Sequence, residues 1–125
     1  MNKREIGMRH EELACSYLEE NGFKVAERNF RSRIGEIDIV GYHEGFLVFV
    51  EVKYRMTDRK GMPEESVIYA KQKRICRAAD YYRLLHKYSD DRPVRYDVIG
   101  IRGTEGEADI RWYKNAFSHI YVRNW

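Results

Sequence analysis

The sequence is poor in cysteine and has no long apolar run, and each absence excludes a class of protein. Its two cysteines, Cys15 and Cys76, stand far apart without Cys-x-x-Cys spacing, so neither a zinc site nor a disulfide framework is indicated. A reduced, cytoplasmic compartment is the simpler inference. The longest strongly apolar run, residues 46–50, is too short to span a membrane, and the charges near the N-terminus precede no apolar run. We therefore expect no export signal and no membrane anchor.

The four histidines also lack metal-ligand spacing, and residue order alone supports no Ser-His-Asp or His-Cys arrangement. With 125 residues, 43% of them hydrophobic and 34% charged, the chain can bury a core without crosslinks. We find no repeat, linker or low-complexity segment. Residues 1–125 are therefore predicted to form a single globular domain.

Basic residues concentrate in the middle of the chain. The net charge is +3, but residues 53–95 carry twelve Lys and Arg against six Asp and Glu, whereas residues 1–52 carry seven against ten. Such asymmetry is typical of proteins that bind a polyanion, because phosphate contacts supply most non-specific nucleic-acid affinity. From charge alone, a solvated helix face is an equally good interpretation.

Apolar residues at helical spacing predict a first helix over residues 6–21, ended by Asn21-Gly22. Glu11 lies at the edge of the apolar stripe that contains Ala14 and Leu18, so it shares the border of the buried face. A glutamate in the first turns of a helix is also favoured by the helix dipole, and periodicity alone favours this structural explanation.

Three short segments after this helix predict strands. Residues 23–25 open the first strand, and residues 27–33 read as a polar connection whose arginines, among them Arg33, either bind a backbone phosphate or form a soluble loop. Residues 36–40 form the second strand, with Asp38 on one face and Ile37 and Ile39 on the other. After a turn at residues 41–45, residues 46–54 are apolar on both faces, the pattern of a central strand.

A long second helix is predicted over residues 64–88, followed by strands at residues 94–101 and 110–113 and a helical turn within residues 115–120. The helix carries a basic flank, and the early polar residue on its apolar stripe, Gln72, either fills a gap in the core or contacts a phosphate. The basic flank comprises Lys71, Lys73, Arg74 and Arg77.

Three charged residues stand where periodicity predicts core. Glu51 and Lys53 interrupt the central strand and project from one face, about 7 Å apart. If the strands that hold Asp38 and Glu51 pair directly, their carboxylates come together and repel, unless a divalent cation binds them. Mg²⁺ prefers such hard oxygen ligands, and Lys53 would stand beside it. A surface ion pair between Glu51 and Lys53 is the alternative, weakened by the apolar run around it.

Asp38, twelve further residues and then Glu51-Val52-Lys53, preceded by a helix with Glu11, resemble the active-site signature of the PD-(D/E)XK nuclease superfamily. More narrowly, several motifs that together cover nearly the whole chain resemble the YraN-like family of uncharacterised bacterial proteins. They are Gly35-Glu36-Ile37-Asp38, Phe49-Val50-Glu51-Val52-Lys53 with Arg55, Glu11-x-x-Ala14, Lys71-Gln72, Arg95-Tyr96-Asp97-Val98 and Asn115-Ala116-Phe117. Two positions depart from the pattern: Ile37 replaces the proline common in the superfamily, and His10 replaces the usual glycine, where it could tilt Glu11 or add a ligand.

The resemblance implies an α/β, restriction-endonuclease-like fold, a central mixed β-sheet flanked by helices in the order αβββαβ. It also implies a catalytic set and a metal site for Mg²⁺ or Mn²⁺, and it reverses the preference that periodicity gave for Glu11. The expected catalytic residues are Glu11, Asp38, Glu51 and Lys53, of which Glu11, Asp38 and Glu51 are the expected metal ligands. The expected nucleic-acid-binding residues are Arg33, Arg55, Lys71, Gln72, Lys73 and Arg74.

The predicted function is therefore a metal-dependent endonuclease or exonuclease that acts on nucleic acid, DNA in the first instance. A general likeness to small Holliday-junction resolvases suggests branched recombination or repair intermediates as substrates. It also suggests a homodimer. Both expectations rest on analogy alone. Two alternatives stay open: a nucleic-acid-binding module that keeps the fold without turnover, and a protein-interaction domain that binds neither metal nor DNA.

Overall fold

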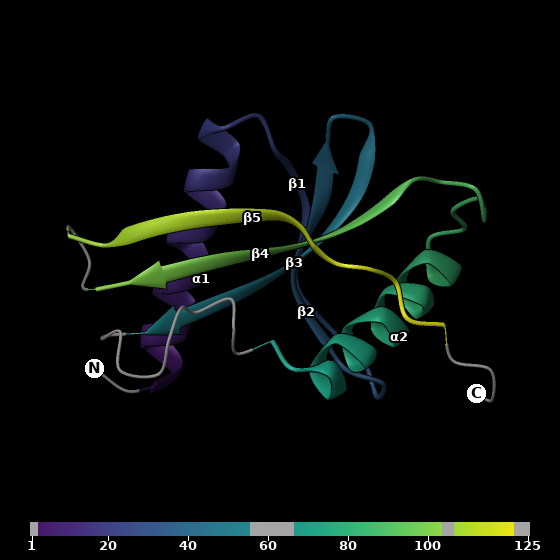
Figure 1. The fold of residues 1–125 in the computed structure, drawn as a ribbon, viewed down its shortest axis with the longest axis horizontal. Helices are drawn as coiled ribbons and strands as arrows, with labels where there is room; N and C mark the ends of the chain where they lie inside the picture. The colour runs from purple at the N-terminus through teal and green to yellow at the C-terminus, as the bar shows by residue number, and fades with distance from the viewer. Residues whose placement is uncertain (1–2, 56–66, 104–106, 122–125) are drawn as a thin grey trace.

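A computed structural model of the chain describes residues 3–55, 67–103 and 107–121, and within these the side chains of residues 3–8 and 55 are not described. The described residues form one five-stranded sheet with a helix on each face (Figure 1). In chain order the elements are α1 (Lys3–Glu20), β1 (Lys24–Arg31), β2 (Glu36–His43), β3 (Phe46–Arg55), α2 (Tyr69–Leu85), β4 (Val94–Arg102) and β5 (Asp109–Phe117).

The sheet is mixed, as expected for a restriction-endonuclease-like core, so the predicted fold class is confirmed. Its strands lie in the order β1-β2-β3-β4-β5, and the first three are antiparallel neighbours. β3 and β4 are parallel, which requires the chain to cross over one face of the sheet, and α2 lies in that crossover. β5 pairs antiparallel with β4 at the edge. Among the described helices, neither is long and apolar enough to cross a membrane.

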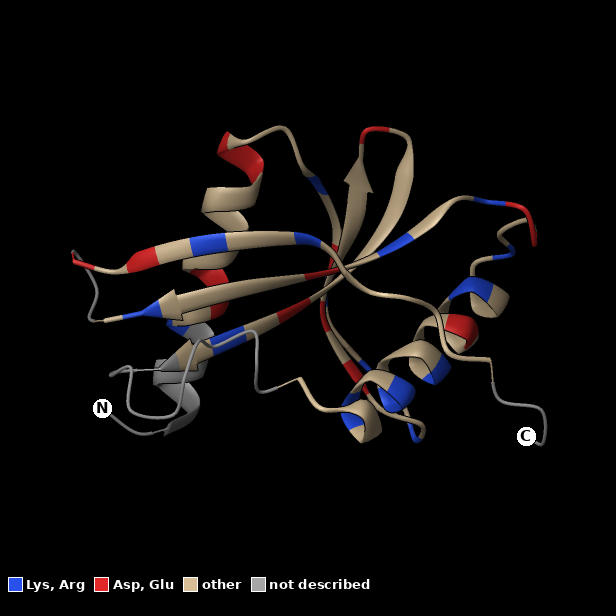
Figure 2. Cartoon of the chain, in the orientation of Figure 1, with Lys and Arg blue, Asp and Glu red and all other residues tan. Residues whose placement is uncertain are grey.

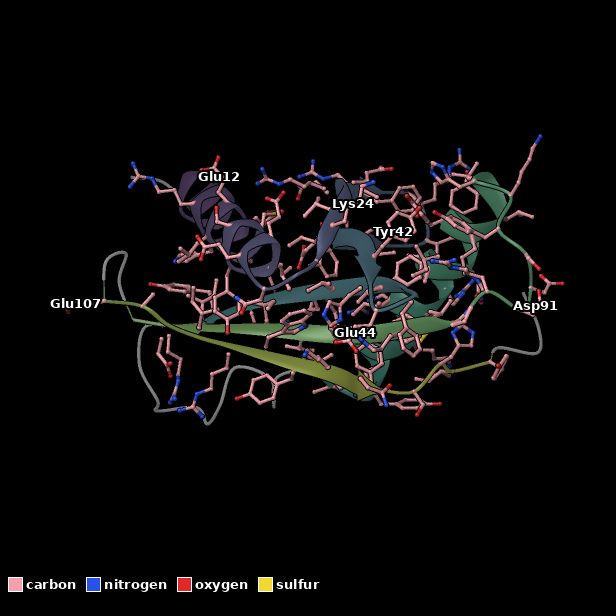
Figure 3. The ribbon with its side chains drawn as sticks, turned by 90° about the horizontal axis from the view of Figure 1, so that it is seen from above. Glu12, Lys24, Tyr42, Glu44, Asp91 and Glu107 are labelled. Atoms are coloured by element: carbon pink, nitrogen blue, oxygen red, sulfur yellow. The ribbon has the colours of Figure 1, made fainter. Side chains whose placement is uncertain are left out.

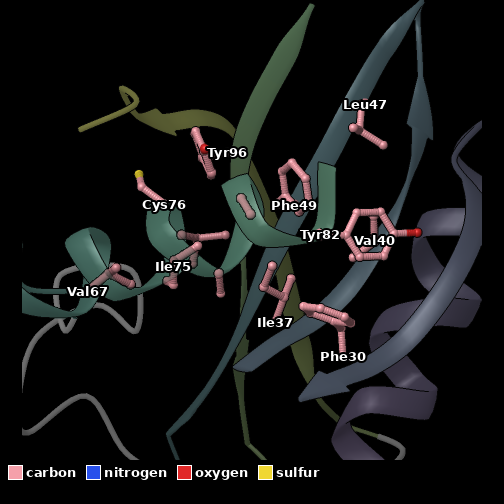
Figure 4. Close-up of a cluster of buried hydrophobic side chains, with 13 residues drawn as sticks. Phe30, Ile37, Val40, Leu47, Phe49, Val67, Ile75, Cys76, Tyr82 and Tyr96 are labelled. Carbon is pink, nitrogen blue, oxygen red and sulfur yellow. The ribbon is translucent and has the colours of Figure 1, made fainter. Parts of the chain in front are cut away.

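Strand β3 divides its apolar side chains between two buried clusters, one under each helix. Leu47 and Phe49 pack in the cluster beneath α2, which Figure 4 shows, whereas Val48 and Val50 pack in the cluster beneath α1. This confirms the prediction of a central strand covered on both faces. By the same alternation, Glu51 and Lys53 continue the face that looks toward α2.

Strand β2 does not keep its alternation, and here the prediction from the sequence was wrong. Ile39 packs beneath α1 as alternation requires, but Ile37 packs beneath α2 together with Val40. Asp38 lies between the two isoleucines, and its partner position in β1 is Asn29, whose backbone has a left-handed φ of 54°. The strand pair therefore bends at this position, and the bend turns Ile37 to the other face.

Several predicted element boundaries also need correction. Residues 27–31, predicted as a polar connection, belong to β1, where side chains of Arg28 and Arg31 are exposed at the edge of the sheet. β5 runs on to Phe117, so no helical turn forms at residues 115–117, and residues 118–120 have no helical structure. The predicted start of the second helix at residues 64–66 lies outside the described residues, and the described helix begins at Tyr69.

A buried carboxylate explains why the strand continues through Asn115. Asp97 is fully buried and accepts four hydrogen bonds, two from the Arg95 guanidinium (2.8 and 2.9 Å), one from Trp112 Nε1 (2.8 Å) and one from the backbone N–H of Asn115 (2.9 Å). Asn115 has a left-handed φ of 54°, and the pairing of β4 with β5 shifts register beside it. The bulge thus places the N–H of Asn115 within hydrogen-bond distance of Asp97.

The same network reaches β2. Arg95 Nη2 donates to His43 Nδ1 at 2.9 Å, and burial, reinforced by Arg95, lowers the pKa of His43, so that the imidazole stays neutral and accepts. The cluster therefore joins the ends of β2, β4 and β5 through groups that are all paired. We conclude that Arg95-Tyr96-Asp97 and Asn115 are structural motifs in this chain.

We expect Asp97→Ala to lower the free energy of unfolding by about 3–5 kcal/mol, because it leaves the buried Arg95 charge without a negative counter-charge. Chemical denaturation followed by circular dichroism would measure this. Asp109→Ala is the matched control: Asp109 also accepts from two arginines, but its side chain is about half exposed and its removal should change stability far less. Equal effects of the two substitutions would contradict the role given to Asp97.

Candidate active site

The candidate site lies where β2 separates from β3. Their pairing is described as far as Ile39 opposite Val50, and one step further along the same register places Asp38 opposite Glu51. At that step the Asp38 side chain replaces the backbone as acceptor: its Oδ2 accepts the N–H of Val52 at 2.7 Å. Asp38 therefore keeps β3 hydrogen-bonded at the point where β2 parts from it. Figure 1 shows the two strands diverging.

Glu51 is the buried acid of the site. Its side chain is only 8% exposed, and its Oε1 lies 3.6 Å from Nζ of Lys53 and 3.6 Å from Nζ of Lys71. Burial, and next the charge of Asp38, raise the pKa of Glu51 to about 7, although both lysines act to lower it. Burial likewise raises the pKa of Asp38, against the N–H of Val52 and the two lysines. Burial thus disfavours the ionised forms of both carboxyl groups by more than the neighbouring lysines favour them.

Glu11 approaches the same place from α1. Glu12 points away from the sheet on the outer side of this helix, whereas Glu11 is partly buried (Figure 3). Burial, and next the charge of Asp38, raise the pKa of Glu11, and a side-chain hydrogen bond with Asn29 lowers it. Glu11 Oε1 is buried and has no hydrogen-bond partner among the described residues. A buried carboxylate oxygen without a donor is an acceptor that a cation or a water could use.

The arrangement suits a cation held by two protein carboxylates. Within the described ranges, no three His, Cys, Asp or Glu side chains stand close enough together to hold a metal ion. The structure therefore brings Glu11 beside Asp38, but not into one ligand group with Asp38 and Glu51, and its role as a ligand stays a prediction. Mg²⁺ is commonly bound through one or two carboxylates with waters and substrate phosphates, and the pair of Asp38 and Glu51 fits this donor set.

The residues predicted to bind nucleic acid divide into two groups. Lys71 lies at the candidate site on Glu51, and Gln72 Nε2 donates to the carbonyl of Val67 at 3.0 Å, so Gln72 braces the start of α2. The others that can be placed, Arg33, Lys73 and Arg74, have exposed side chains. The side chain of Arg55 lies outside the described residues.

Sequence reasoning did not assign two residues to their place at the site. Lys71 was expected to contact nucleic acid rather than Glu51, and Asn29 was not singled out. Lys71 stands in the family-like motif Lys71-Gln72, but that motif does not indicate a contact with Glu51, and other basic residues surround it. Asn29 has a weak one, since asparagine tolerates the left-handed backbone that the bend requires. His10, the departure from the family pattern, stacks on Tyr54 at 3.6 Å between ring centroids.

Comparison with known proteins gives the family. Residues 10–101 match the model of the uncharacterised protein family UPF0102. A UPF0102 protein of Lachnoclostridium phytofermentans is 46% identical over 117 residues, which are 94% of this chain and 96% of the relative. UPF0102 proteins of Thermodesulfovibrio yellowstonii and Nitrosococcus oceani are 42% and 39% identical, covering 94% and 91% of this chain and 99% and 92% of the relatives. The chain therefore belongs to the UPF0102 family, the YraN-like family that its motifs resemble.

Proposed function

We propose that this protein is a metal-dependent nuclease that hydrolyses phosphodiester bonds of DNA, with Mg²⁺ or Mn²⁺ as its cofactor. The observation that carries the proposal is the pair of Asp38, which is partly buried, and Glu51, which is buried: burial raises the pKa of both carboxyl groups, and Lys53 and Lys71 lie beside Glu51. A pair of this kind destabilises a folded chain unless it binds a cation. Such a loss of stability is tolerated where catalysis requires the pair.

Asp38 and Glu51 would hold the metal, which when bound would supply Lewis acidity for the phosphate and a lowered pKa for an attacking water. The backbone already orients one ligand, because the N–H of Val52 fixes Asp38 Oδ2 and leaves Oδ1 for another partner. Glu51 is positioned by the central strand on which it lies, and buried neighbours restrict its motion. Both ligands thus stand on rigid parts of the sheet.

Lys53 and Lys71 would serve the phosphate. Each ammonium lies 3.6 Å from Glu51 Oε1, a distance that permits ionic attraction without a tight hydrogen bond. With Glu51 engaged by a bound cation, these ammonium groups could donate to the oxygens of a phosphodiester and would stabilise the charge that develops there. Lys53 comes from the sheet and Lys71 from α2, so the two would hold the phosphate from different sides.

A polyanionic substrate agrees with the distribution of charge around the site. The acidic residues of β2 and β3 lie opposite basic residues in the first turns of α2 (Figure 2). Of these basic residues, Lys73 and Arg74 have exposed side chains, and Arg33 is exposed on the turn between β1 and β2. These exposed cations would bind the nucleic-acid backbone while the buried acids stay available to a metal.

We expect the protein to cut DNA in Mg²⁺ or Mn²⁺ and not in EDTA, tested on linear, nicked, flapped and four-way DNA. Asp38→Ala and Lys53→Ala should each lower the rate by roughly a hundredfold or more, because the stabilisation of transition-state charge is worth several kcal/mol. Asp91→Ala is the control, since Asp91 is an exposed acid in the turn before β4. The proposal fails if no substrate is cut, or if Asp38→Ala cuts as fast as the natural chain. Salt-dependent binding without cleavage, unchanged by EDTA, would instead identify a binding module.

The closeness of the two acids can be tested without substrate or metal. We expect Asp38→Asn to lower the pKa of Glu51 from about 7 toward its ordinary value of 4.5, but only partway, because burial remains the larger cause. Carboxyl ¹³C NMR titration of metal-free protein would measure both values. An unchanged Glu51 pKa in Asp38→Asn would show that the carboxyl groups do not interact.

The raised pKa of Glu51 also predicts the pH dependence of stability. Its folded-state pKa lies above its unfolded-state value, so the folded protein binds the proton more tightly and ionisation favours unfolding. The contribution of Glu51 to the unfolding free energy should therefore fall as the pH rises from about 4.5 to about 7. Glu51→Gln should remove this part of the profile, as measured by urea denaturation of metal-free protein across that range.

A further inference from the structure

A second feature of the same side of the molecule is a pocket beside the turn that joins β1 to β2. It has a volume of about 410 Å³ and lies between this turn and the second half of α2. Its apolar lining comes from Phe30, Ile34, Tyr81 and Leu85, and its charged lining from Arg31 and Arg33. Its volume falls within the range of small-molecule sites, about 300–1,000 Å³.

The aromatic wall of the pocket is held in place by the core. Phe30 is buried, and its ring meets Tyr82 edge to face with centroids 5.0 Å apart. Tyr81 lies against Phe30 at 6.2 Å and is partly exposed, so one part of its ring packs while another is accessible. Leu85, half exposed, extends the apolar surface at the end of α2. The Tyr81 ring, tilted by 40° from that of Phe30, is the partly exposed aromatic ring of this wall, and such a ring can stack on a nucleobase.

The basic rim of the pocket is equally well positioned. Ser32 Oγ accepts the N–H groups of Ile34 (3.2 Å) and Gly35 (3.3 Å), and Ser32 N–H donates to the Gly35 carbonyl at 3.0 Å. The turn is therefore held by its own hydrogen bonds and presents Arg33 outward. Arg31 faces Glu36 at 3.8 Å, but both side chains are mostly exposed, so this pair restrains Arg31 weakly. Two arginine side chains remain available to phosphate groups.

The pocket also adjoins the candidate active site. Phe30 pairs with Ile37 across β1 and β2, and the next pair along is Asn29 with Asp38. Arg31 is near enough to Glu11 to lower its pKa. At about 3.3 Å per residue and about 4.8 Å between strands, the one strand position and one strand that separate Phe30 from Asp38 put their backbones roughly 6 Å apart. A nucleic-acid strand could therefore occupy both.

The other large pocket of the described region does not share this chemistry. It is lined by Asp80 and Asp90 together with Arg83 and Lys87, so its charges are mixed. Carboxylates on a pocket wall repel phosphates, whereas the pocket beside the turn has only basic charges. Charge complementarity thus favours a polyanion at the turn and not at the far end of α2.

We propose that the pocket beside the turn binds an unpaired nucleotide of the substrate strand, with its base against Tyr81 and its phosphates on Arg31 and Arg33. This inference rests on the proposed function and names its substrate class: nucleic acid that is single-stranded next to the bond to be cut. A paired base cannot present its face to Tyr81, because its neighbours in the duplex already stack on it.

Binding to labelled oligothymidine of roughly 12 nucleotides and to a blunt duplex, measured by fluorescence anisotropy in EDTA, tests this. The natural chain should bind the single strand more tightly than the duplex. Tyr81→Leu keeps apolar packing but removes the ring, so it should weaken single-strand binding about fivefold to a hundredfold and leave duplex binding unchanged. Tyr81→Phe should restore binding. Tyr17→Leu, at a partly buried tyrosine on the opposite helix α1, is the matched control.

Arg33→Ala gives a second test that does not depend on packing, since this side chain is exposed. It should weaken single-strand binding and reduce the slope of log affinity against log salt by roughly 0.7. Equal affinity for single strand and duplex would contradict the proposal that the pocket binds an unpaired nucleotide. So would the absence of any effect of Tyr81→Leu and Arg33→Ala. Because EDTA prevents metal-dependent cleavage, pocket binding without any cleavage in Mg²⁺ would uphold this inference and refute the nuclease.

Discussion

The candidate site depends on one hydrogen bond, from the N–H of Val52 to the carboxylate of Asp38. In an uninterrupted antiparallel pair a backbone carbonyl of β2 would be the acceptor, and β2 would continue alongside β3. The side chain takes that place instead, so the end of β3 keeps its hydrogen bond although β2 turns away. The bend at Asn29, where the backbone is left-handed, makes room for this exchange.

The parting of the strands lets charged side chains from both faces of the sheet approach Asp38. Glu51, Lys53 and Lys71 come from the side of α2, and Glu11 comes from α1 on the other side. In an intact sheet the backbone would separate these groups. Asp38 lies between them and raises the pKa of both glutamates. A site that joins the two faces therefore requires the local failure of strand pairing.

The sequence predicted the parts of this arrangement that depend on local pattern, and it missed those that depend on contacts between distant segments. The apolar run before Glu51 located β3, because pattern reports burial directly, whereas the approach of Asp38 to Glu51 was expected only on the condition that their strands pair directly. The face of Ile37 was wrong because alternation assumes a straight strand, and the bend originates in the neighbouring strand at Asn29. Lys71 was not expected on Glu51, because the packing of a helix against a sheet sets such a contact and no local pattern encodes it. Residues 27–31 were too polar to read as strand, since an edge strand exposes much of its surface.

The motifs that resemble the family include the buried Asp97 and the partly buried Asp38, and the partners of each carboxylate distinguish a structural role from a chemical one. Asp97 accepts four hydrogen bonds, two from Arg95 on its own strand and two from β5, so its charge is used within the fold. Asp38 accepts one hydrogen bond from Val52 and lies beside two further acids whose pKa values are raised. A network whose donors match its acceptors stabilises a fold, whereas an excess of buried acceptors calls for a ligand that brings positive charge. Asp38 and Asp97 are the same type of residue. The number of hydrogen-bond donors around each carboxylate is what separates a structural role from a chemical one.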